Sequence, residues 1–353
     1  MQNESLELSL LSIFSIISFF TFFIIQKISN KIFSGALLDS DFNKPQAFHN
    51  NHIPRSGGLA SIISFFTFIF LNNILFSVVY LDYLILGTGL FLIGFLDDIK
   101  VRFSAKSRLI VMVIFLYIVT KIFSFEINQI DLIFLQDILK IDLFFNFFIV
   151  LCFLFIINGS NLIDGFNGLL SINLIIINII LTYINMNNGH LEFSILIISQ
   201  IIILLSFLLF NFPNAKIFLG DSGAYTMGAL VGLNTIITNN LNPEISSFFF
   251  CTLLFYLFFE VFFSFLRKLL QKKSPIYPDD KHLHMLSFYK ISVIYGKNKG
   301  NYLNSIIINF FYLILIIPGL YLLHDPQLSR YWFFILLLIY LLIYSRLYRF
   351  TKN

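Results

Sequence analysis

Charge is scarce in this sequence. Asp, Glu, Lys and Arg make up 12% of its 353 residues, whereas soluble domains carry roughly 25%. Hydrophobic residues make up 58%, and the mean hydropathy is +0.86. So little charge excludes a soluble globular protein and predicts a protein that crosses a membrane several times.

Cysteine is scarce too. Cys152 and Cys251 are the two in the chain, and both fall inside apolar runs. They form no disulfide or zinc pattern, so we expect packing roles for them. Phenylalanine is abundant instead, with 47 residues beside many Ile and Asn, and this bias makes a Phe stripe weak evidence for a cofactor pocket.

Long apolar runs are plentiful. A helix of about 20 apolar residues crosses a hydrocarbon core of roughly 30 Å, and eleven such windows occur, of which the third is short and the fifth has vague ends. The first lacks the basic region and cleavage site of a signal peptide, so we expect it to be retained. No repeat or linker divides the chain, which predicts one all-α domain over residues 1–353 with about 11 transmembrane helices. The windows are 5–26, 58–78, 80–96, 107–125, 142–157, 168–187, 192–210, 223–239, 246–266, 302–323 and 331–348.

Lys and Arg are unevenly distributed among the loops. With eleven spans, 20 of the 23 lie in loops after odd-numbered spans or at the C-terminus, while the other side keeps Lys121, Lys140 and Arg330. Cytoplasmic loops carry the basic excess. We therefore expect the N-terminus outside and the C-terminus in the cytoplasm.

Five polar strings share the predicted cytoplasmic face. Turn residues alone are the ordinary connection between apolar runs, but these strings also carry acids, amides, basic residues and histidines. Because they lie on one face, they predict one composite site. They are His49–Gly58 (HNNHIPRSGG), Gly94–Arg108 (GFLDDIKVRFSAKSR), Asn158–Leu170 (NGSNLIDGFNGLL), Asn211–Ala224 (NFPNAKIFLGDSGA) and Ser274–Leu286 (SPIYPDDKHLHML).

Asp97 and Asp98 lie where the third run meets this face. Adjacent side chains on a helix point about 100° apart, so the two acids would serve different partners. They could be helix-end charges facing water, but acids at a membrane boundary are costly and commonly functional. The basic residues that follow would suit a phosphate: Lys100, Arg102, Lys106 and Arg108.

Asp221 precedes the eighth run and has glycines on both sides that allow close backbone approach. It could be a helix N-cap. Together with Asp98, Asp164 and Asn161, it suits Mg²⁺, which prefers few carboxylates plus substrate phosphates.

His282 and His284 lie in the most basic loop. HxH alone is weak evidence for zinc, since no Cys or third His stands near. Next to a phosphate they would donate hydrogen bonds, and the alternative is a pair of ordinary surface histidines. Arg55 could reach a phosphate or simply belong to a rigid turn into the second run.

In this order the strings resemble the motifs of the polyprenyl-phosphate N-acetylhexosaminyl-1-phosphate transferases, glycosyltransferase family four. PRSGG, FLDD, NLIDGFNG, FLGDSG and HLHM stand where that family has PRxGG, an aspartate pair, NxxDGxDG or NxxDGxNG, FxGDxGS and HxHH. The resemblance covers about residues 41–290, and eleven spans match the undecaprenyl-phosphate GlcNAc-1-phosphate transferase-like branch. Asn167, Ala224 and Met285 depart from the motifs, and Met285 argues against the peptidoglycan-type branch.

The resemblance implies a role for each residue. Asp221 and Asn161 would bind Mg²⁺, or Mn²⁺, on the donor's diphosphate. Asp97 would contact or deprotonate the lipid phosphate with Asp98 supporting it, and which acid is the base stays open. The other implied residues are Asp164, Asn167 and Asn211 for the nucleotide, and Arg55, Lys106, Arg108, His282 and His284 for phosphates; Asp164 and the histidines count among the catalytic residues.

The implied reaction transfers a HexNAc-1-phosphate, with GlcNAc the commonest, from a UDP-sugar to undecaprenyl phosphate. It releases UMP and begins a cell-surface polysaccharide such as O-antigen. The enzyme would lie in a bacterial inner membrane with a cytoplasmic site and no nucleic-acid partner, and homodimerisation stays open.

One alternative is a transporter or flippase for a lipid-linked sugar. That class has charges inside the membrane and paired broken helices, whereas here the charges collect on one face. The other is an inactive relative that serves as a partner. The intact Asp97, Asp98, Asp164 and Asp221 argue against it.

Overall fold

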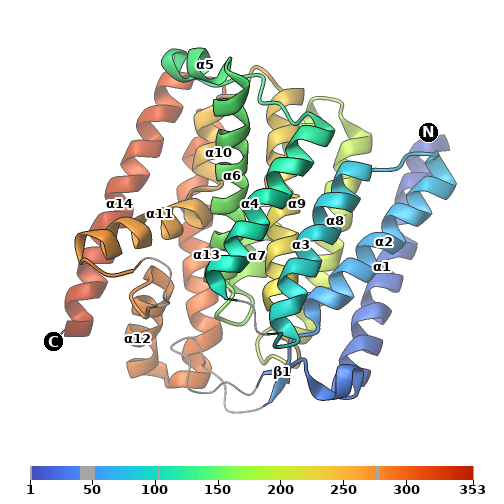
Figure 1. The fold of residues 1–353 in the computed structure, drawn as a ribbon, viewed down its shortest axis with the longest axis horizontal. Helices are drawn as coiled ribbons and strands as arrows, with labels where there is room; N and C mark the ends of the chain where they lie inside the picture. Colours follow the sequence, from blue (N-terminus) through green and yellow to red (C-terminus); the bar gives the residue numbers. More distant parts are fainter. Residues whose placement is uncertain (1, 40–51, 102–103, 275–278, 353) are drawn as a thin grey trace.

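The computed structural model describes residues 2–39, 52–101, 104–274 and 279–352 (Figure 1). Within them the structure is helical apart from one ribbon and the connecting loops, which confirms the all-α class. The helices are α1 (Gln2–Ile28), η1 (Ile32–Gly35), α2 (Gly57–Phe76), α3 (Leu81–Asp98), α4 (Ala105–Phe123), α5 (Ile133–Leu139), α6 (Asp142–Ile163), α7 (Leu169–Asn187), α8 (Leu191–Asn211), α9 (Gly220–Leu241), α10 (Ser247–Leu253), α11 (Phe255–Leu270), α12 (Leu283–Tyr295), α13 (Lys297–Tyr321) and α14 (Pro326–Lys352).

Each of the eleven apolar windows lies on a helix or a helix pair. Seven helices are long and apolar enough to cross a membrane, namely α1, α2, α6, α7, α8, α13 and α14, and the α10–α11 pair makes eight if it is one span. The other three windows fall on α3, α4 and α9. Because α3 carries three acids, α4 three basic residues and α9 many Gly, Thr and Asn, eleven spans stays a prediction.

The window 246–266 is not one straight span. It bends by 75° between α10 and α11, where the backbone of Leu254 leaves the helical region with φ −90° and ψ 3°. In Figure 1, α11 runs across the direction of the neighbouring helices. Hydropathy registers composition and not direction, so the sequence predicted a single span here.

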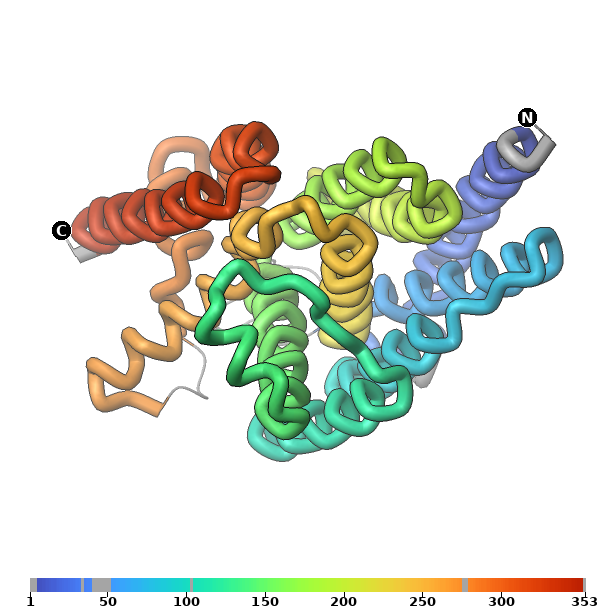
Figure 2. Tube along the Cα trace, turned by 90° about the horizontal axis from the view of Figure 1, so that it is seen from above, coloured from blue at the N-terminus to red at the C-terminus, as the bar shows by residue number. Residues whose placement is uncertain are grey.

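Helix α9 lies in the middle of the bundle (Figure 2) and packs against α2, α3, α6 and α7. Its polar residues are bonded inside the protein. The Asn234 Oδ1 atom accepts from the Tyr83 hydroxyl at 2.8 Å, and its Nδ2 donates to Asn178 Oδ1 at 3.0 Å and to Gln200 Oε1 at 2.7 Å. A helix with low hydropathy can therefore be buried here, because other helices and not lipid surround it.

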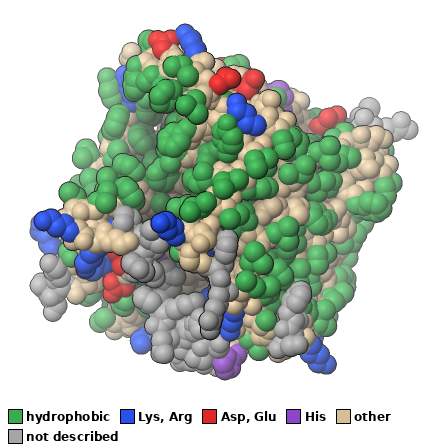
Figure 3. Space-filling view, viewed as in Figure 1, with side chains coloured by type: hydrophobic (Ala, Val, Ile, Leu, Met, Phe, Trp, Pro, Cys, Tyr) green, Lys and Arg blue, Asp and Glu red, His purple; other side chains and the backbone are tan. Residues whose placement is uncertain are grey.

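The ends of the bundle differ from its sides. Figure 3 shows hydrophobic side chains over the visible lateral face and charged side chains toward the two ends. The termini lie toward opposite ends, and β1, α12 and the C-terminus share one of them (Figure 1). The ribbon there pairs β1 (Leu38–Asp39) antiparallel with β2 (Ile53–Pro54).

Candidate active site

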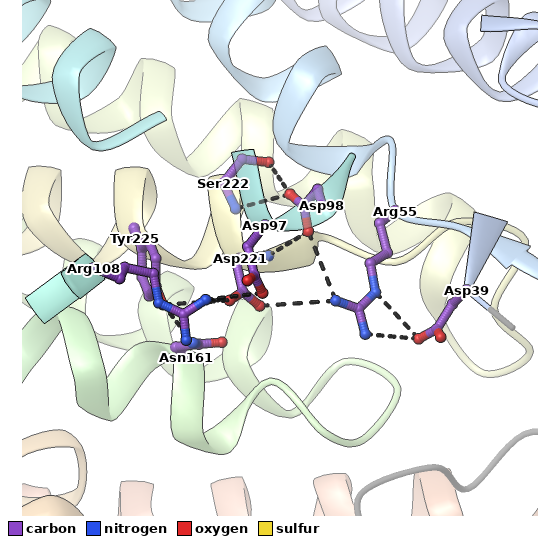
Figure 4. Close-up of polar contacts among 9 residues, drawn as sticks. All are labelled: Asp39, Arg55, Asp97, Asp98, Arg108, Asn161, Asp221, Ser222 and Tyr225. Atoms are coloured by element: carbon purple, nitrogen blue, oxygen red, sulfur yellow. Dashed lines mark hydrogen bonds and ion pairs between the residues drawn. The ribbon is translucent and has the colours of Figure 1, made fainter. Parts of the chain in front are cut away.

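The start of α9 is held by Asp98, the last residue of α3. Asp98 Oδ1 accepts from the backbone N–H of Asp221 at 2.9 Å, and Oδ2 accepts from the N–H and the hydroxyl of Ser222 at 3.0 and 2.5 Å (Figure 4). Free N–H groups at a helix start favour an anion. Asp98 is 1% exposed. Its carboxylate fixes the backbone on both sides of the Asp221 Cα atom, since its two oxygens accept from both N–H groups.

Two glycines make this close approach feasible. A Cβ atom on Gly220, whose φ is +77°, would lie 2.7 Å from both Asp98 carboxylate oxygens. A Cβ atom on Gly94 of α3 would lie 2.5 Å from the Ser222 Cα atom. Gly220 of FLGDSG and Gly94 of GFLDD are therefore needed for α3 and α9 to meet here.

Asp97 points to a different partner. Its Oδ2 atom lies 2.8 Å from Arg108 Nη1, and the same nitrogen lies 3.0 Å from Asp221 Oδ2. The two adjacent acids thus serve different groups, as the helical geometry predicted. The Arg108 guanidinium, from the first turn of α4, bridges Asp97 and Asp221 and lies over the Tyr225 ring at 5.8 Å.

Asp97, Asp98, Arg108 and Asp221 form a polar cluster, and Arg55 joins it from the β1–β2 ribbon. Its Nε and Nη2 atoms donate to Asp39 Oδ2 at 3.1 and 2.8 Å. Its Nη1 atom lies 3.8 Å from Asp98 Oδ1 and 4.0 Å from Asp221 Oδ1. Burial lowers the pKa of Arg55, but the carboxylates of Asp221, Asp39 and Asp98 raise it further, above its ordinary value. This guanidinium is a permanent cation directed at two acids.

Asn161 and Asp164 face the cluster from the end of α6. Asn161 Nδ2 donates to the Tyr225 hydroxyl at 3.0 Å, and that hydroxyl donates to Asp221 Oδ2 at 3.3 Å. Asp164 follows directly after α6. Burial and the nearby Asp221 and Asp98 carboxylates raise its pKa well above the ordinary value, while Arg55 opposes this. The Asp164 side chain would therefore need a further cation beside it to carry a negative charge.

The donor set suits a hard divalent cation. The Arg108 guanidinium is surrounded by carboxylate oxygens of Asp97 and Asp221 and by the Asn161 amide (Figure 4). These groups therefore already hold one positive charge. Among the described residues, no three His, Cys, Asp or Glu side chains form a ready metal site. Mg²⁺ commonly takes one or two carboxylates and completes its shell with substrate phosphates and water, so these residues fit it.

Asn167 and Asn211 join two loops near the cluster. Asn211 is buried, and its Oδ1 accepts from the Gly168 N–H at 2.7 Å while its Nδ2 donates to the Ile217 carbonyl at 2.9 Å. The Asn167 side chain donates to the Pro213 carbonyl at 2.8 Å. Both amides therefore hold Asn158–Leu170 against the loop before α9, and the half-buried Asn167 is the more accessible of the two.

The two histidines are not surface residues, so that alternative is wrong: His282 is 2% and His284 0% exposed. The ring nitrogens of His282 lie 3.3 Å from Glu260 Oε2 and 3.3 Å from Asp279 Oδ1. His284 Nδ1 lies 3.4 Å from the Tyr256 hydroxyl, and its Nε2 has no hydrogen-bond partner among the described residues. Burial lowers the pKa of His284 to about 3, so this ring is neutral.

Residues 281–284, here called the histidine stretch, contact the loop after α6 through Phe166. The Phe166 ring packs edge-on against His284, with 5.9 Å between centroids. In addition, Asn301 Oδ1 accepts from the Asn167 N–H at 2.8 Å. The beginnings of α12 and α13 thus contact the loop that carries Asp164.

Other predicted positions lie apart or outside the described residues. Lys106 is exposed on α4 and makes no ion pair within the described part of the chain. Of the predicted strings, His49–Asn51, Arg102 and Pro275–Pro278 fall outside the described residues.

Sequence reasoning missed several residues around the cluster. Tyr225 lies one helical turn after Asp221, and that i, i+4 spacing could have revealed it. Glu260 is an acid inside an apolar run, which is itself a signal. Asp279 lies in the fifth polar string but was not singled out there. No local pattern pointed to Asp39 or Asn301, because each lies near the site only through the fold.

The helical bundle and its polar cluster define a multi-pass membrane protein with a site suited to anionic substrates. The model of glycosyl transferase family 4 matches residues 80–239. A Thermotoga maritima undecaprenyl-phosphate alpha-N-acetylglucosaminyl 1-phosphate transferase is 30% identical over 251 residues, which are 69% of this chain and 70% of that protein. The chain therefore belongs to glycosyl transferase family 4, as its motifs predicted, and is an enzyme of that family.

Other relatives agree with this assignment. A Bacillus subtilis protein named a probable undecaprenyl-phosphate N-acetylglucosaminyl 1-phosphate transferase is 26% identical over 266 residues, or 74% of this chain and 71% of the relative. A Clostridium perfringens phospho-N-acetylmuramoyl-pentapeptide-transferase is 27% identical over 196 residues, or 52% of this chain and 61% of the relative. Similarity thus extends over more of the chain with the N-acetylglucosaminyl enzymes.

Proposed function

We propose that this enzyme transfers a HexNAc-1-phosphate, with GlcNAc-1-phosphate the first candidate, from a UDP-sugar to undecaprenyl phosphate. The observation that carries the proposal is the pair of guanidinium groups, Arg55 and Arg108, directed at Asp221 where α3, α4 and α9 meet. Two anionic substrates need cations around the reacting phosphorus. The names of the relatives supply the substrate classes.

In this reaction an oxygen of the lipid phosphate attacks the phosphorus bonded to the sugar. A new P–O bond forms, the bond to the uridine-side phosphate breaks, and UMP leaves with its electron pair. Asp221 and Asn161 would hold Mg²⁺, which when bound would neutralise charge on the donor's diphosphate. Arg55 would contact the same phosphates, held in place by its two hydrogen bonds to Asp39.

Asp97 and Arg108 would receive the lipid phosphate. Arg108 Nη1 is shared by Asp97 and Asp221 at 2.8 and 3.0 Å, so an incoming phosphate can replace a carboxylate as its partner. The nucleophile already carries charge, and positioning therefore contributes more than proton removal. Asp98 would act by fixing the backbone at Asp221, and Asp164 and Asn167 would hold the nucleotide.

The proposed setting is a bacterial inner membrane with eleven spans, an outer N-terminus and a cytoplasmic site. The acceptor's tail is apolar, so the lipid phosphate would reach the cluster from the bilayer while the donor arrives from water. The product would be the first lipid-linked intermediate of a surface polysaccharide such as lipopolysaccharide O-antigen.

The test uses the purified full chain in detergent with undecaprenyl phosphate and Mg²⁺. Labelled UDP-GlcNAc and related UDP-HexNAc donors are offered one at a time, and lipid-linked sugar and UMP are measured. We expect equal amounts of both products from at least one donor, and loss of activity on removal of divalent cations with EDTA. Absence of both products with every donor would refute the transfer.

A separate variant tests whether Asp221 binds Mg²⁺. Asp221→Asn removes the charge that would hold Mg²⁺ but keeps the side chain's size, so we expect turnover to fall by about 100-fold or more, as for other charge-stabilising groups. Retention of Mg²⁺-dependent turnover in this variant would remove Asp221 from the metal site.

A further inference from the structure

The C-terminal helix α14 takes part in a second hydrophobic cluster. This cluster is separate from the main core and joins α11, α12 and α14 through Phe255, Phe259, Leu286, Leu336, Tyr340 and Tyr344. Figure 1 shows α14 beside α11 at one side of the bundle, with α12 below α11. All of α14 lies outside residues 80–239, the part that matches the family model.

Two tyrosines on α14 have their rings inside this cluster. Tyr340 and Tyr344 are one helical turn apart and stack with 6.2 Å between centroids and 12° between planes. They are 4% and 7% exposed. Tyr340 also meets Phe259 edge-on at 4.9 Å, and Tyr344 meets Phe263 at 4.7 Å. Packing therefore accounts for the rings, and the hydroxyls remain to be explained.

Both hydroxyls bond to the histidine stretch or to the acid that holds it. The Tyr340 hydroxyl donates to Glu260 Oε1 at 3.0 Å, and the Tyr344 hydroxyl donates to the Lys281 carbonyl at 3.1 Å. Glu260 Oε1 also accepts from the Leu283 N–H at 3.1 Å, and Oε2 lies 3.3 Å from His282 Nδ1. Residues 281–283 are thus held by one tyrosine directly and by the other through Glu260.

The Glu260 carboxylate makes the arrangement sensitive to a single hydroxyl. It is 1% exposed, and a buried charge must be satisfied by hydrogen bonds. Without the Tyr340 hydroxyl, Oε1 would keep one donor in place of two. The carboxylate that fixes the start of α12 would then be free to shift, and His284 follows directly.

We propose that Tyr340 and Tyr344 are positioning residues, through which α14 sets the place of His282 and His284 in the active site. The inference rests on the proposed transfer for its functional consequence, but the positioning itself can be measured separately. His284 is the residue positioned for use, because His282 is enclosed by two carboxylates whereas His284 Nε2 has no partner among the described residues.

The test compares the variants Tyr340→Phe, Tyr344→Phe and the double variant with the wild-type protein, each as the full chain. Phe keeps the ring and removes the hydroxyl, so the cluster stays filled. Tyr331→Phe is the matched control, because it makes the same change on the same helix at a ring that is 56% exposed. Two readouts are used: kcat and KM for both substrates, and hydrogen exchange of the backbone amides of residues 281–286.

We expect Tyr340→Phe to lower kcat by about 10-fold or more, since hydrogen bonds to charged groups contribute most. Tyr344→Phe, which loses a bond to a neutral carbonyl, should lower kcat by about 2- to 10-fold. Both KM values should stay within about twofold, because groups that act at the transition state change kcat. Exchange at the Leu283 amide should accelerate by about 10-fold in Tyr340→Phe, while Tyr331→Phe matches the wild type.

Two results would overturn the proposal. One is wild-type exchange at 281–286 in both single variants. The other is faster exchange throughout α11 and α14 with a lower melting temperature, since that would make the hydroxyls general stabilisers. If the wild-type chain forms no lipid-linked sugar, the proposed transfer fails, yet the exchange measurement still decides whether α14 positions the histidines.

Discussion

At the residue scale, the adjacent acids Asp97 and Asp98 make different contacts in the structure. Asp98 accepts three hydrogen bonds from Asp221 and Ser222, whereas Asp97 faces Arg108 with its side chain 32% exposed. A carboxylate whose two oxygens both accept hydrogen bonds from the protein is poorly placed to contact substrate or a metal. The geometry thus favours Asp97 as the acid that meets substrate and Asp98 as the acid that holds α9.

A stability comparison separates these two roles. In Asp98→Asn an NH₂ group replaces one acceptor and faces N–H donors, so we expect a loss of roughly 1.5–3 kcal/mol in stability. Asp97→Asn should change stability by less than about 1 kcal/mol, since its ion pair is partly exposed, but should reduce turnover. Thermal unfolding in detergent measures the first effect and the transfer assay the second. Equal melting temperatures for the two variants would contradict the assignment.

At the scale of elements, the site depends on how closely α3 approaches α9. Gly94 faces backbone, with a Cβ atom there placed 2.5 Å from Ser222 Cα and 2.6 Å from Asp221 C. Gly87, about two turns earlier on α3, faces side chains of α9 and α2, and a Cβ atom there would lie 3.6 Å or more from its neighbours. An alanine should therefore be disruptive at Gly94 and tolerated at Gly87.

We expect Gly94→Ala to force α3 away from α9 and to cost about 1–3 kcal/mol, as overpacking commonly does. Turnover should fall as well, since Asp98 would no longer reach the start of α9. Gly87→Ala is the matched control and should leave both the melting temperature and turnover near wild type. If Gly94→Ala behaves like Gly87→Ala, the close approach of the two helices is not required.

At the scale of the whole molecule, the polar cluster lies beside the β1–β2 ribbon, since Arg55 directly follows β2. The strand β1, α12 and the C-terminus share one end of the bundle (Figure 1). A membrane around the apolar sides would leave that end in one compartment. The distribution of 20 of 23 basic residues predicts that this compartment is the cytoplasm.

Cysteine labelling tests this orientation. After Cys152 and Cys251 are replaced by Ser, single cysteines are introduced as Asn128→Cys and Lys272→Cys. In intact cells we expect a membrane-impermeant thiol reagent to label the first and to reach the second only after permeabilisation. The reverse pattern would invert the proposed topology, and labelling of both from outside would contradict the span count.

Much of the fold and the site could be predicted from the sequence, because both depend on local patterns. Apolar runs of helical length predict α1, α2 and α6–α9 without reference to any partner. Polar strings between such runs stand out because lipid excludes them. Asp97, Arg108, Asp221, Asn161 and Arg55 were all found in this way, and the structure brings them into one cluster.

What the tertiary structure decided is direction and distance. The resemblance assigned different roles to Asp97 and Asp98, but the sequence could not show what Asp98 contacts, since its partners at the start of α9 lie more than 120 residues later. It could not give the 75° bend at Leu254, because hydropathy has no direction. Nor could it connect Tyr340 with Glu260, 80 residues apart, because a hydrogen bond depends on where packing brings two helices and not on their separation along the chain.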